Sequence, residues 1–399
     1  LPTLGMYGGY EYMESNSFCG EVCHAIMEPE YVTHQAGFHS QVHCVDCHIR
    51  PGADWYMKAK INGARQLVEA VRGTYSKPIP TPIEHLPPDE VVCVQCHRAE
   101  AGASHRVRER AYFLGNADNT PWHITLVTWI NGGGGAPSEG AHWHRNQKMT
   151  FVVSDAKRLQ VDQVTWETDA GPKIYTRSGT PMSPDTLLAR QADHKEVTMG
   201  CLDCHNRPAH RFLSPVEAVN AALESGNLDA SIPWIKREAV LALSGEYDAK
   251  ETAGDSLEAR LQLAFEAYGL TADSHAVSQV RDIYQANNFP GMDVRWDRYP
   301  EHQGHLEWPG CFRCHGSQLR TAEGETISAD CNLCHAILDQ GIPDIESPEW
   351  TTLEGTNFRH PVDVRDPNLR LQCVECHSGG GALYSLGKTP RAQSTTSGY

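Results

Sequence analysis

Apolar residues recur at helical spacing in the first quarter of the chain. Over residues 55–73, Ile61, Ala64, Val68 and Val71 fall on one side of a helix. This spacing predicts an amphipathic helix there.

Residues 214–288 carry the longest helical pattern in the sequence. Ser214 is a residue type that caps helices, and it precedes a helix that we expect to begin at Pro215 and to end near Gly226. Three further helices are expected over residues 232–244, 256–268 and 273–287.

Between these two parts, β-branched and aromatic residues gather in short runs. The runs at residues 124–130, 149–153 and 163–166 have the composition of strands, and the glycines from Gly132 to Gly135 separate the first run from the second. The pattern predicts a small β-rich insertion over residues 112–195. The rest of the chain shows neither period, so we expect a mainly α protein with much irregular structure.

A short phrase recurs through the irregular parts: two cysteines followed at once by a histidine. Six copies have two residues between the cysteines and one has three, and together they use all 14 cysteines. In chain order the phrases are Cys19, Cys23 and His24; Cys44, Cys47 and His48; Cys93, Cys96 and His97; Cys201, Cys204 and His205; Cys311, Cys314 and His315; Cys331, Cys334 and His335; and Cys373, Cys376 and His377.

Cys-x-x-Cys-His is the attachment signature of a c-type haem. The two thiols bond the vinyl groups of one porphyrin, and the histidine becomes the first axial ligand of its iron. A disulfide framework gives no reason for a histidine after every second cysteine, and zinc ribbons use paired units that close on one ion. The sequence therefore predicts seven covalently bound haem c groups.

This haem load changes the expected fold. Seven haems leave 57 residues each (399/7), so porphyrins should supply much of the apolar core. We therefore expect a multihaem cytochrome c fold, mainly α and wrapped around seven haems, with the small β-rich insertion between the third and fourth.

Charge and the chemistry of haem attachment limit partners and location. The formal net charge of -16 disfavours nucleic acid and favours a basic redox partner. Covalent haem attachment takes place outside the cytoplasm, which predicts a periplasmic or extracellular protein. The apolar opening, residues 1–10, is too short to span a bilayer. These residues are either the outer end of a transmembrane helix or a loose apolar N-terminus.

The motifs resemble those of the NapC/NirT (NrfH-like) family of membrane-anchored quinol dehydrogenases, and in particular its heptahaem inner-membrane members from metal-respiring bacteria. The matching features are the irregular first motif followed by Met27, then His39, Cys47-His48-Ile49-Arg50-Pro51-Gly52, Trp55 and Lys60, the fourth motif with His210 behind it, Asn288-Phe289-Pro290, Gly304-His305, and Pro309-Gly310 before the fifth motif.

The resemblance implies electron transfer from menaquinol or ubiquinol to periplasmic cytochromes, at the periplasmic side of the inner membrane. It suggests Met27 and Lys60 as residues at the quinol site, with Glu69 as the carboxylate and Glu28, Glu30 and Asp54 as alternatives to it. It also implies a membrane anchor in a segment outside this sequence or in a partner subunit. The chain departs from the family in the three residues between its first two cysteines, and in Gln66 and Leu67, which stand where the family has a carboxylate.

Fourteen histidines remain for the second axial positions. With Met27, the candidates are His39, His142, His144, His210, His305 and His360, which gives one per iron beside the seven motif histidines. His142 and His144 flank Trp143, so on an extended segment they would point the same way and could serve two irons. The alternative is one ligand and one surface histidine. His210 is expected to bind the iron of another motif, and His194 is the alternative to any of the six.

The expected organisation has six parts: residues 1–111 with haems one to three, 112–195 as the β-rich insertion, 196–213 with haem four, 214–290 as a helical region, 291–386 with haems five to seven, and 387–399 as a polar tail. The leading functional hypothesis is a quinol-oxidising conduit. The alternatives are a pure relay, either in a respiratory complex or as an extracellular wire, and a terminal oxyanion reductase.

Overall fold

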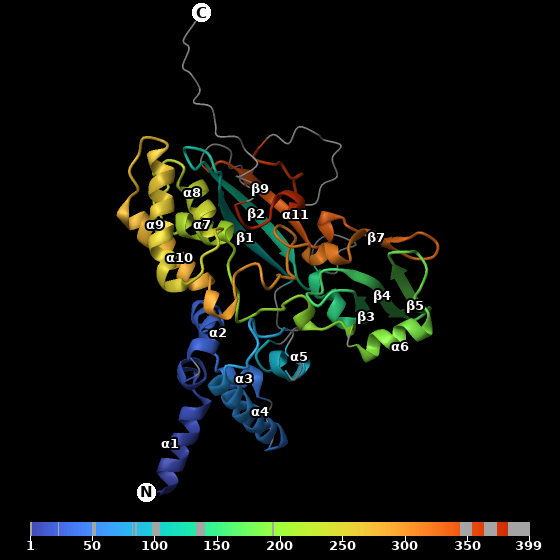
Figure 1. The fold of residues 1–399 in the computed structure, drawn as a ribbon. Coiled ribbons are helices and arrows are strands. Elements are labelled where there is room, and N and C mark those ends of the chain that lie inside the picture. The colour runs from blue at the N-terminus through green and yellow to red at the C-terminus, as the bar shows by residue number, and fades with distance from the viewer. Residues whose placement is uncertain are drawn as a thin grey trace, which may run out of the picture.

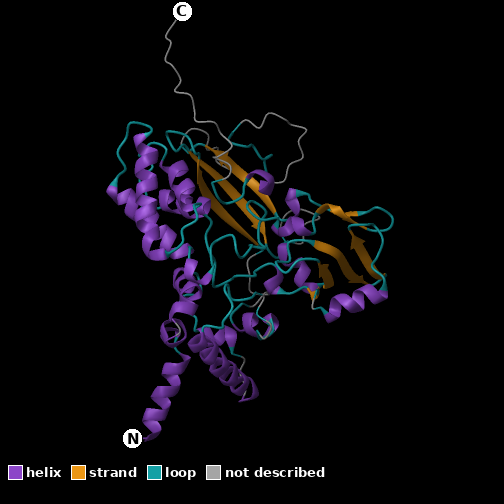
Figure 2. Ribbon diagram, in the orientation of Figure 1, coloured by secondary structure: helices purple, strands orange, loops and turns teal. Residues whose placement is uncertain are grey.

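The computed structural model describes residues 2–22, 24–49, 53–81, 83, 86–97, 104–132, 140–193, 195–343, 353–362 and 373–381. Helices at the N-terminal end project from a body that contains two β-sheets and a group of four helices (Figure 1). The helices form one side of this body, and the strands occupy two separate regions beside them (Figure 2).

The N-terminal part is helical. Its elements are α1 (Pro2–Glu14), a π-helical turn (Phe18–Val22), α2 (His24–Ala36), α3 (Cys44–His48), α4 (Ala53–Arg72) and the short α5 (Asp89–Val92). Helix α4 confirms the helix predicted from apolar spacing. Within the ranges given above, no helix has both the length and the apolar character that crossing a bilayer requires.

Four helices confirm the helical pattern of residues 214–288: α7 (Pro215–Glu224), α8 (Ile235–Leu243), α9 (Lys250–Glu266) and α10 (Ser274–Asn287). Helix α9 begins at Lys250 rather than at residue 256, where it was expected. Ser214 caps α7 in the predicted way, because its hydroxyl accepts from the amide of Glu217 while the Glu217 carboxylate accepts from the amide of Ser214. The four helices bury a core of ordinary side chains, including Val219, Leu257 and Phe265.

The first sheet has the strand order β1-β2-β9 and is antiparallel throughout. Strands β1 (His105–Phe113) and β2 (Pro121–Trp129) form a hairpin, and β9 (His335–Gly341) joins β2 from a distant part of the chain. Alternate residues of β2 are buried, and Val127 and Trp129 pack with Ala336 and Leu338 of β9.

The second sheet has the order β6-β3-β4-β5-β7-β8. Its strands are β3 (Lys148–Val153), β4 (Val161–Thr168), β5 (Gly171–Thr176), β6 (Glu196–Thr198), β7 (Gly316–Arg320) and β8 (Thr326–Ile327). Helix α6 (Pro184–Ala192) lies in the connection between β5 and β6 (Figure 1). Phe151, Val164 and Leu319 lie in the hydrophobic core of this second sheet.

The mainly α, haem-wrapped fold expected from the sequence is wrong. The described residues contain two sheets, and β7, β8 and β9 come from the part that was interpreted as irregular haem-binding chain. Strand β9 was not predicted, because its apolar run consists only of Ala336, Ile337 and Leu338 and directly follows a cysteine motif. The expectation that porphyrins supply the core also fails for the helical group, where side chains bury one another.

Candidate metal centres

The cysteine motifs form one kind of local structure, a tight turn. In the third, fourth, fifth and seventh motifs the amide of the histidine donates to the carbonyl of the first cysteine, at 2.7 to 3.0 Å. The turn brings both thiols and the following imidazole together, as the attachment of one porphyrin requires. The structure describes twelve of the cysteines, and Cys23 and the side chains of His24 and Cys376 lie outside the described part.

Six motif histidines each face a second histidine. The pairs, with the distances between ring centroids, are His48 and His210 at 6.2 Å, His97 and His39 at 6.0 Å, His205 and His142 at 6.4 Å, His315 and His144 at 5.9 Å, His335 and His305 at 6.0 Å, and His377 and His360 at 6.0 Å. Two imidazoles on opposite faces of one metal ion, each about 2 Å from it, have centroids about 6 Å apart. The spacing fits one iron between the members of each pair.

Hydrogen bonds on the far side of the rings hold several of these histidines. Nδ1 lies 3.0 Å from the Pro208 carbonyl in His39, 2.8 Å from the Glu30 carbonyl in His210, 3.0 Å from the Ala141 carbonyl in His144, and 2.6 Å from the Ser328 carbonyl in His315. A carbonyl at Nδ1 fixes the proton there and leaves Nε2 as the metal-binding nitrogen.

Burial keeps the paired rings in the form that binds metal. It is the leading cause that lowers the pKa of His205 and His315, and it lowers the pKa of His210 to about 4. A neutral imidazole has a free lone pair for a metal ion, whereas an imidazolium has none. In the pair at the sixth motif, Nδ1 of His305 and of His335 is buried without a hydrogen-bond partner.

His142 and His144 lie on the 3₁₀-helix Ala141–Asn146 rather than on the extended segment expected from the sequence. The two imidazoles still approach different motifs, His142 the fourth and His144 the fifth. Between them, Trp143 packs edge-on against Trp166 of β4, which anchors this helix to the second sheet.

Other histidines have surroundings unlike those of the pairs. Both ring nitrogens of the buried His302 contact backbone carbonyls, of Asp203 and Lys157, so neither is free. Nε2 of His123 lies 2.9 Å from the Asp339 carboxylate in the buried face of the first sheet. His194, the alternative ligand, lies outside the described residues.

His34 is a buried histidine that was not among the ligands proposed from the sequence. Its side chain is buried on α2, and its ring centroid lies 6.0 Å from that of His210. The signal in the sequence was its position seven residues after Met27, two helical turns along the same face. His34 is thus a second neighbour for the ring that faces His48.

The first six motifs lie near one another in their chain order. In five places a thiol of one motif shifts the pKa of a thiol in the neighbouring motif: Cys44 shifts that of Cys19, Cys96 that of Cys47, Cys201 that of Cys93, and Cys311 those of Cys204 and Cys334. The first six attachment turns therefore form a continuous row.

Hydrogen bonds fix the middle of this row. Asp89, at the start of α5, accepts from the amide of Leu202 in the fourth motif at 3.0 Å. Arg313 of the fifth motif is buried and donates to the carbonyl of Asp203 in the fourth at 2.8 Å. The same guanidinium donates to the carbonyls of Gly310 and Arg158.

The residues suggested for a quinol site are only partly brought together. Lys60 and Glu69 lie on opposite sides of α4, nine residues apart, and Glu69 lies 3.7 Å from Arg65. Lys60 instead binds Glu14 at the end of α1, with 2.8 Å between Nζ and Oε1. The sequence interpretation missed Glu14, because only the packing of two helices brings it to the lysine. Met27 is half-buried on α2.

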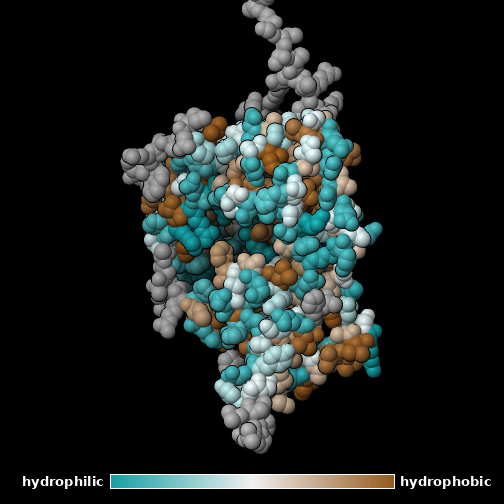
Figure 3. All heavy atoms as spheres, turned by 90° about the vertical axis from the view of Figure 1, so that its left-hand side faces the viewer, coloured by the Kyte–Doolittle hydropathy of each residue, from teal (hydrophilic) through white to brown (hydrophobic). Residues whose placement is uncertain are grey.

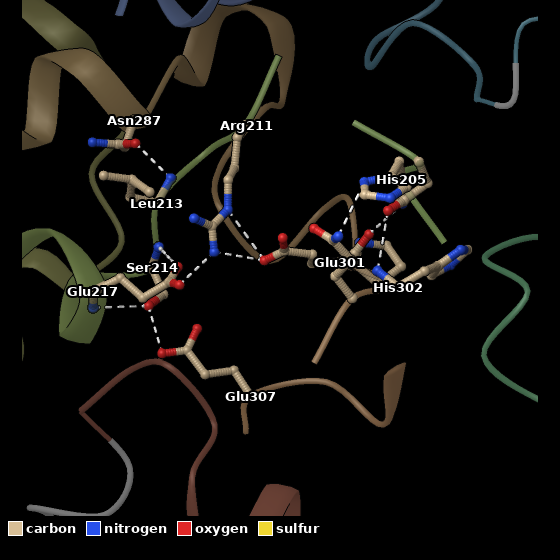
Figure 4. Close-up of polar contacts among 12 residues, drawn as sticks. His205, Arg211, Leu213, Ser214, Glu217, Asn287, Glu301, His302 and Glu307 are labelled. Atoms are coloured by element: carbon tan, nitrogen blue, oxygen red, sulfur yellow. Dashed lines mark hydrogen bonds and ion pairs between the residues drawn. The ribbon is translucent and has the colours of Figure 1, made fainter. Parts of the chain in front are cut away.

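A polar cluster of Arg211, Ser214, Glu217, Glu301 and Glu307 lies beside the fourth motif (Figure 4). The Arg211 guanidinium bridges the carboxylates of Glu217 and Glu301, at 2.5 and 2.7 Å. Ser214 donates to Glu307 at 2.7 Å. Burial is the leading cause that raises the pKa of Glu307 to about 8, followed by the charge of Glu217, and both favour the protonated form of this carboxyl.

Comparisons with known proteins identify the family. No protein-family model and no solved structure matches the chain. It is 38% identical over 394 residues to the cytochrome c-type protein ImcH of Geobacter sulfurreducens, a match that covers 96% of this chain and 76% of the relative. The resemblance to the NapC/NirT family stays a prediction. The chain belongs to the same family as ImcH and is a c-type cytochrome, an electron-transfer protein with covalently attached haem.

Proposed function

We propose that this cytochrome carries seven haem c groups and conducts electrons from a membrane quinol to a redox partner on the periplasmic side of the membrane. The observation that carries the proposal is the set of six histidine pairs about 6 Å apart, together with the row of attachment turns. A conduit requires neighbouring redox centres in an unbroken series.

The residues fit the cofactor. Each Cys-x-x-Cys-His turn would hold one haem through its two thiols and its histidine, and the paired histidine would supply a further nitrogen ligand. When bound, haem c supplies one-electron redox chemistry. The protein sets the ligand type, the burial and the spacing. Met27 is the candidate for the second axial position of the first motif, where a thioether would raise the reduction potential relative to a second imidazole.

The N-terminal end is where we place quinol oxidation. Lys60 can donate a hydrogen bond to a quinol oxygen, and Glu14, in contact with Lys60, can accept the proton that oxidation releases. Both are only partly exposed, with 33% and 17% of their side chains accessible. This arrangement replaces Glu69 with Glu14 as the proposed carboxylate of the site.

The experiment is anaerobic reduction of the haem-loaded protein by a menaquinol analogue, followed through the sharp visible bands of reduced haem c. We expect reduction by the quinol, slower reduction in Glu14→Gln, and partial recovery in Glu14→Asp. Lys148→Gln, which changes an exposed lysine on β3, serves as the control and should reduce at the rate of the parent.

Reduction by dithionite but not by the quinol at any pH would contradict this proposal and favour a pure relay. The mass of the mature protein tests the haem count, because seven attachments must appear as seven covalent increments. For the electron acceptor, the net charge of -16 favours a basic protein. Added salt should therefore slow electron transfer from this cytochrome to a lysine-rich one.

A further inference from the structure

Helix α4 presents its apolar side to solvent. Met57, Ile61, Val68 and Val71 form a stripe along one face, and their exposed fractions are 57%, 66%, 47% and 82%. Ala64 lies in the same stripe and is exposed too. We call these five residues the α4 stripe.

The opposite face of α4 is partly covered by the protein. Ala59, Asn62, Glu69 and Ala70 lie there and are half-buried, whereas Gln66 on the same face is exposed. A surface helix of a soluble protein ordinarily turns its apolar stripe inward and its polar residues outward. In α4 the apolar stripe instead faces outward, and an exposed apolar stripe of this kind is typical of a contact surface.

Basic side chains border the stripe. On the helical wheel Lys60 lies along one edge, and Arg65 and Arg72 lie along the other. These cations stand out in a chain whose net charge is -16. Long basic side chains beside an apolar face are typical of helices that lie in the surface of an anionic bilayer, where the stems stay with the apolar face and the charges reach the headgroups.

Helix α1 adds aromatic side chains at the same end of the molecule. Tyr7, Tyr10 and Tyr12 are exposed, and tyrosine is enriched at the depth of the lipid headgroups. Figure 1 shows that α1 and α4 project together from this end, and Figure 3 shows brown, apolar side chains gathered towards it. The ion pair between Glu14 and Lys60 joins the two helices.

We propose that α4 is a membrane-surface helix whose stripe lies among the lipids of an anionic bilayer. The basic borders favour a lipid surface over a second copy docked stripe to stripe, because such a copy would bring the same cations against them, whereas anionic headgroups carry the complementary charge. The inference rests on the proposed function and extends it. A helix in the membrane surface would hold Lys60 and Glu14 at the depth from which a quinol approaches.

The test is sedimentation of the haem-loaded 399-residue protein with vesicles, either of phosphatidylcholine alone or of phosphatidylcholine with phosphatidylglycerol. We expect binding to the anionic vesicles. The double variant Ile61→Gln and Val68→Gln should bind at least about tenfold more weakly. Leu263→Gln is the matched control, because Leu263 is 70% exposed on α9, and it should bind like the parent.

A second arm tests the basic borders. Arg65→Gln with Arg72→Gln should weaken binding to the anionic vesicles and leave binding to the neutral ones unchanged. Equal binding by the parent and by the stripe variant would overturn the proposal. So would a loss of self-association in the stripe variant, seen by analytical ultracentrifugation, without any vesicle binding by the parent. Because this readout needs no quinol, failure of vesicle binding and failure of quinol oxidation are distinguishable.

Discussion

Replacement of His144 by alanine should create one open iron at the fifth motif. The His144 and His315 rings have centroids 5.9 Å apart, and both are held through Nδ1 by backbone carbonyls. Alanine removes the nitrogen donor without disturbing the attachment turn. Its neighbour His142 faces His205 at 6.4 Å, so it is not free to replace the lost ligand.

The size of the effect follows from the motif count. Six-coordinate iron with two nitrogen axial ligands is low-spin, and loss of one ligand leaves a five-coordinate or water-bound, high-spin iron. With seven motifs in the chain, about one-seventh of the ferric iron should move from low-spin to high-spin signals if each motif carries one haem.

Electron paramagnetic resonance of the oxidised protein measures this fraction, and added imidazole should restore the low-spin signal by filling the open position. His275→Ala is the matched control, because His275 is an exposed histidine on α10. An unchanged low-spin spectrum in His144→Ala would refute the axial role of His144. A high-spin fraction that imidazole does not reduce would indicate general damage to the protein.

Three further predictions concern single buried or paired groups. Arg313→Met leaves three backbone carbonyls without their donor and should lower the stability by on the order of 4 kcal/mol, seen as a lower denaturant midpoint, whereas Arg320→Met, on an exposed arginine of β7, should not. Burial lowers the pKa of Lys236 to about 7. The unfolded chain therefore binds one more proton than the folded one from about pH 7 to 10, and the stability should rise across that range by about 1.4 kcal/mol per pH unit. Lys236→Met should remove this rise, and a slope identical to that of the parent would exclude Lys236 as its source. Lys60→Gln should slow reduction by quinol while leaving reduction by dithionite unchanged, and equal slowing of both would point to a disturbed haem path instead.

More of the candidate metal centres than of the fold could be predicted from the sequence. The six distal histidines proposed from motif phrases are the six whose rings face motif histidines. Short sequence patterns were enough to select these histidines, because each lies near a cysteine motif or within a short polar segment. Glu14 and His34 were missed because their relevance depends on which helices pack together, and no local pattern states that.

The strands were harder to predict for a related reason. β1 reads Arg-Val-Arg-Glu-Arg over residues 106–110, and this charged run has little of the alternation that marks a half-buried strand. Its place in a sheet depends on β2, whose own apolar run was recognised. The apolar run of β9 is short and becomes a strand because β2 offers it a buried edge.

Strand β2 pairs with β9, which lies about 200 residues later in the chain, so one edge of β2 stays unpaired during much of translation. The hairpin of β1 and β2 is complete long before residues 335–341 leave the ribosome, so one edge of β2 stays without backbone partners in the interval. An unpaired apolar edge invites pairing with another chain. In a protein truncated before Ala336, this edge of β2 would stay unpaired permanently. Such a protein should aggregate even if haem were attached at every earlier cysteine motif.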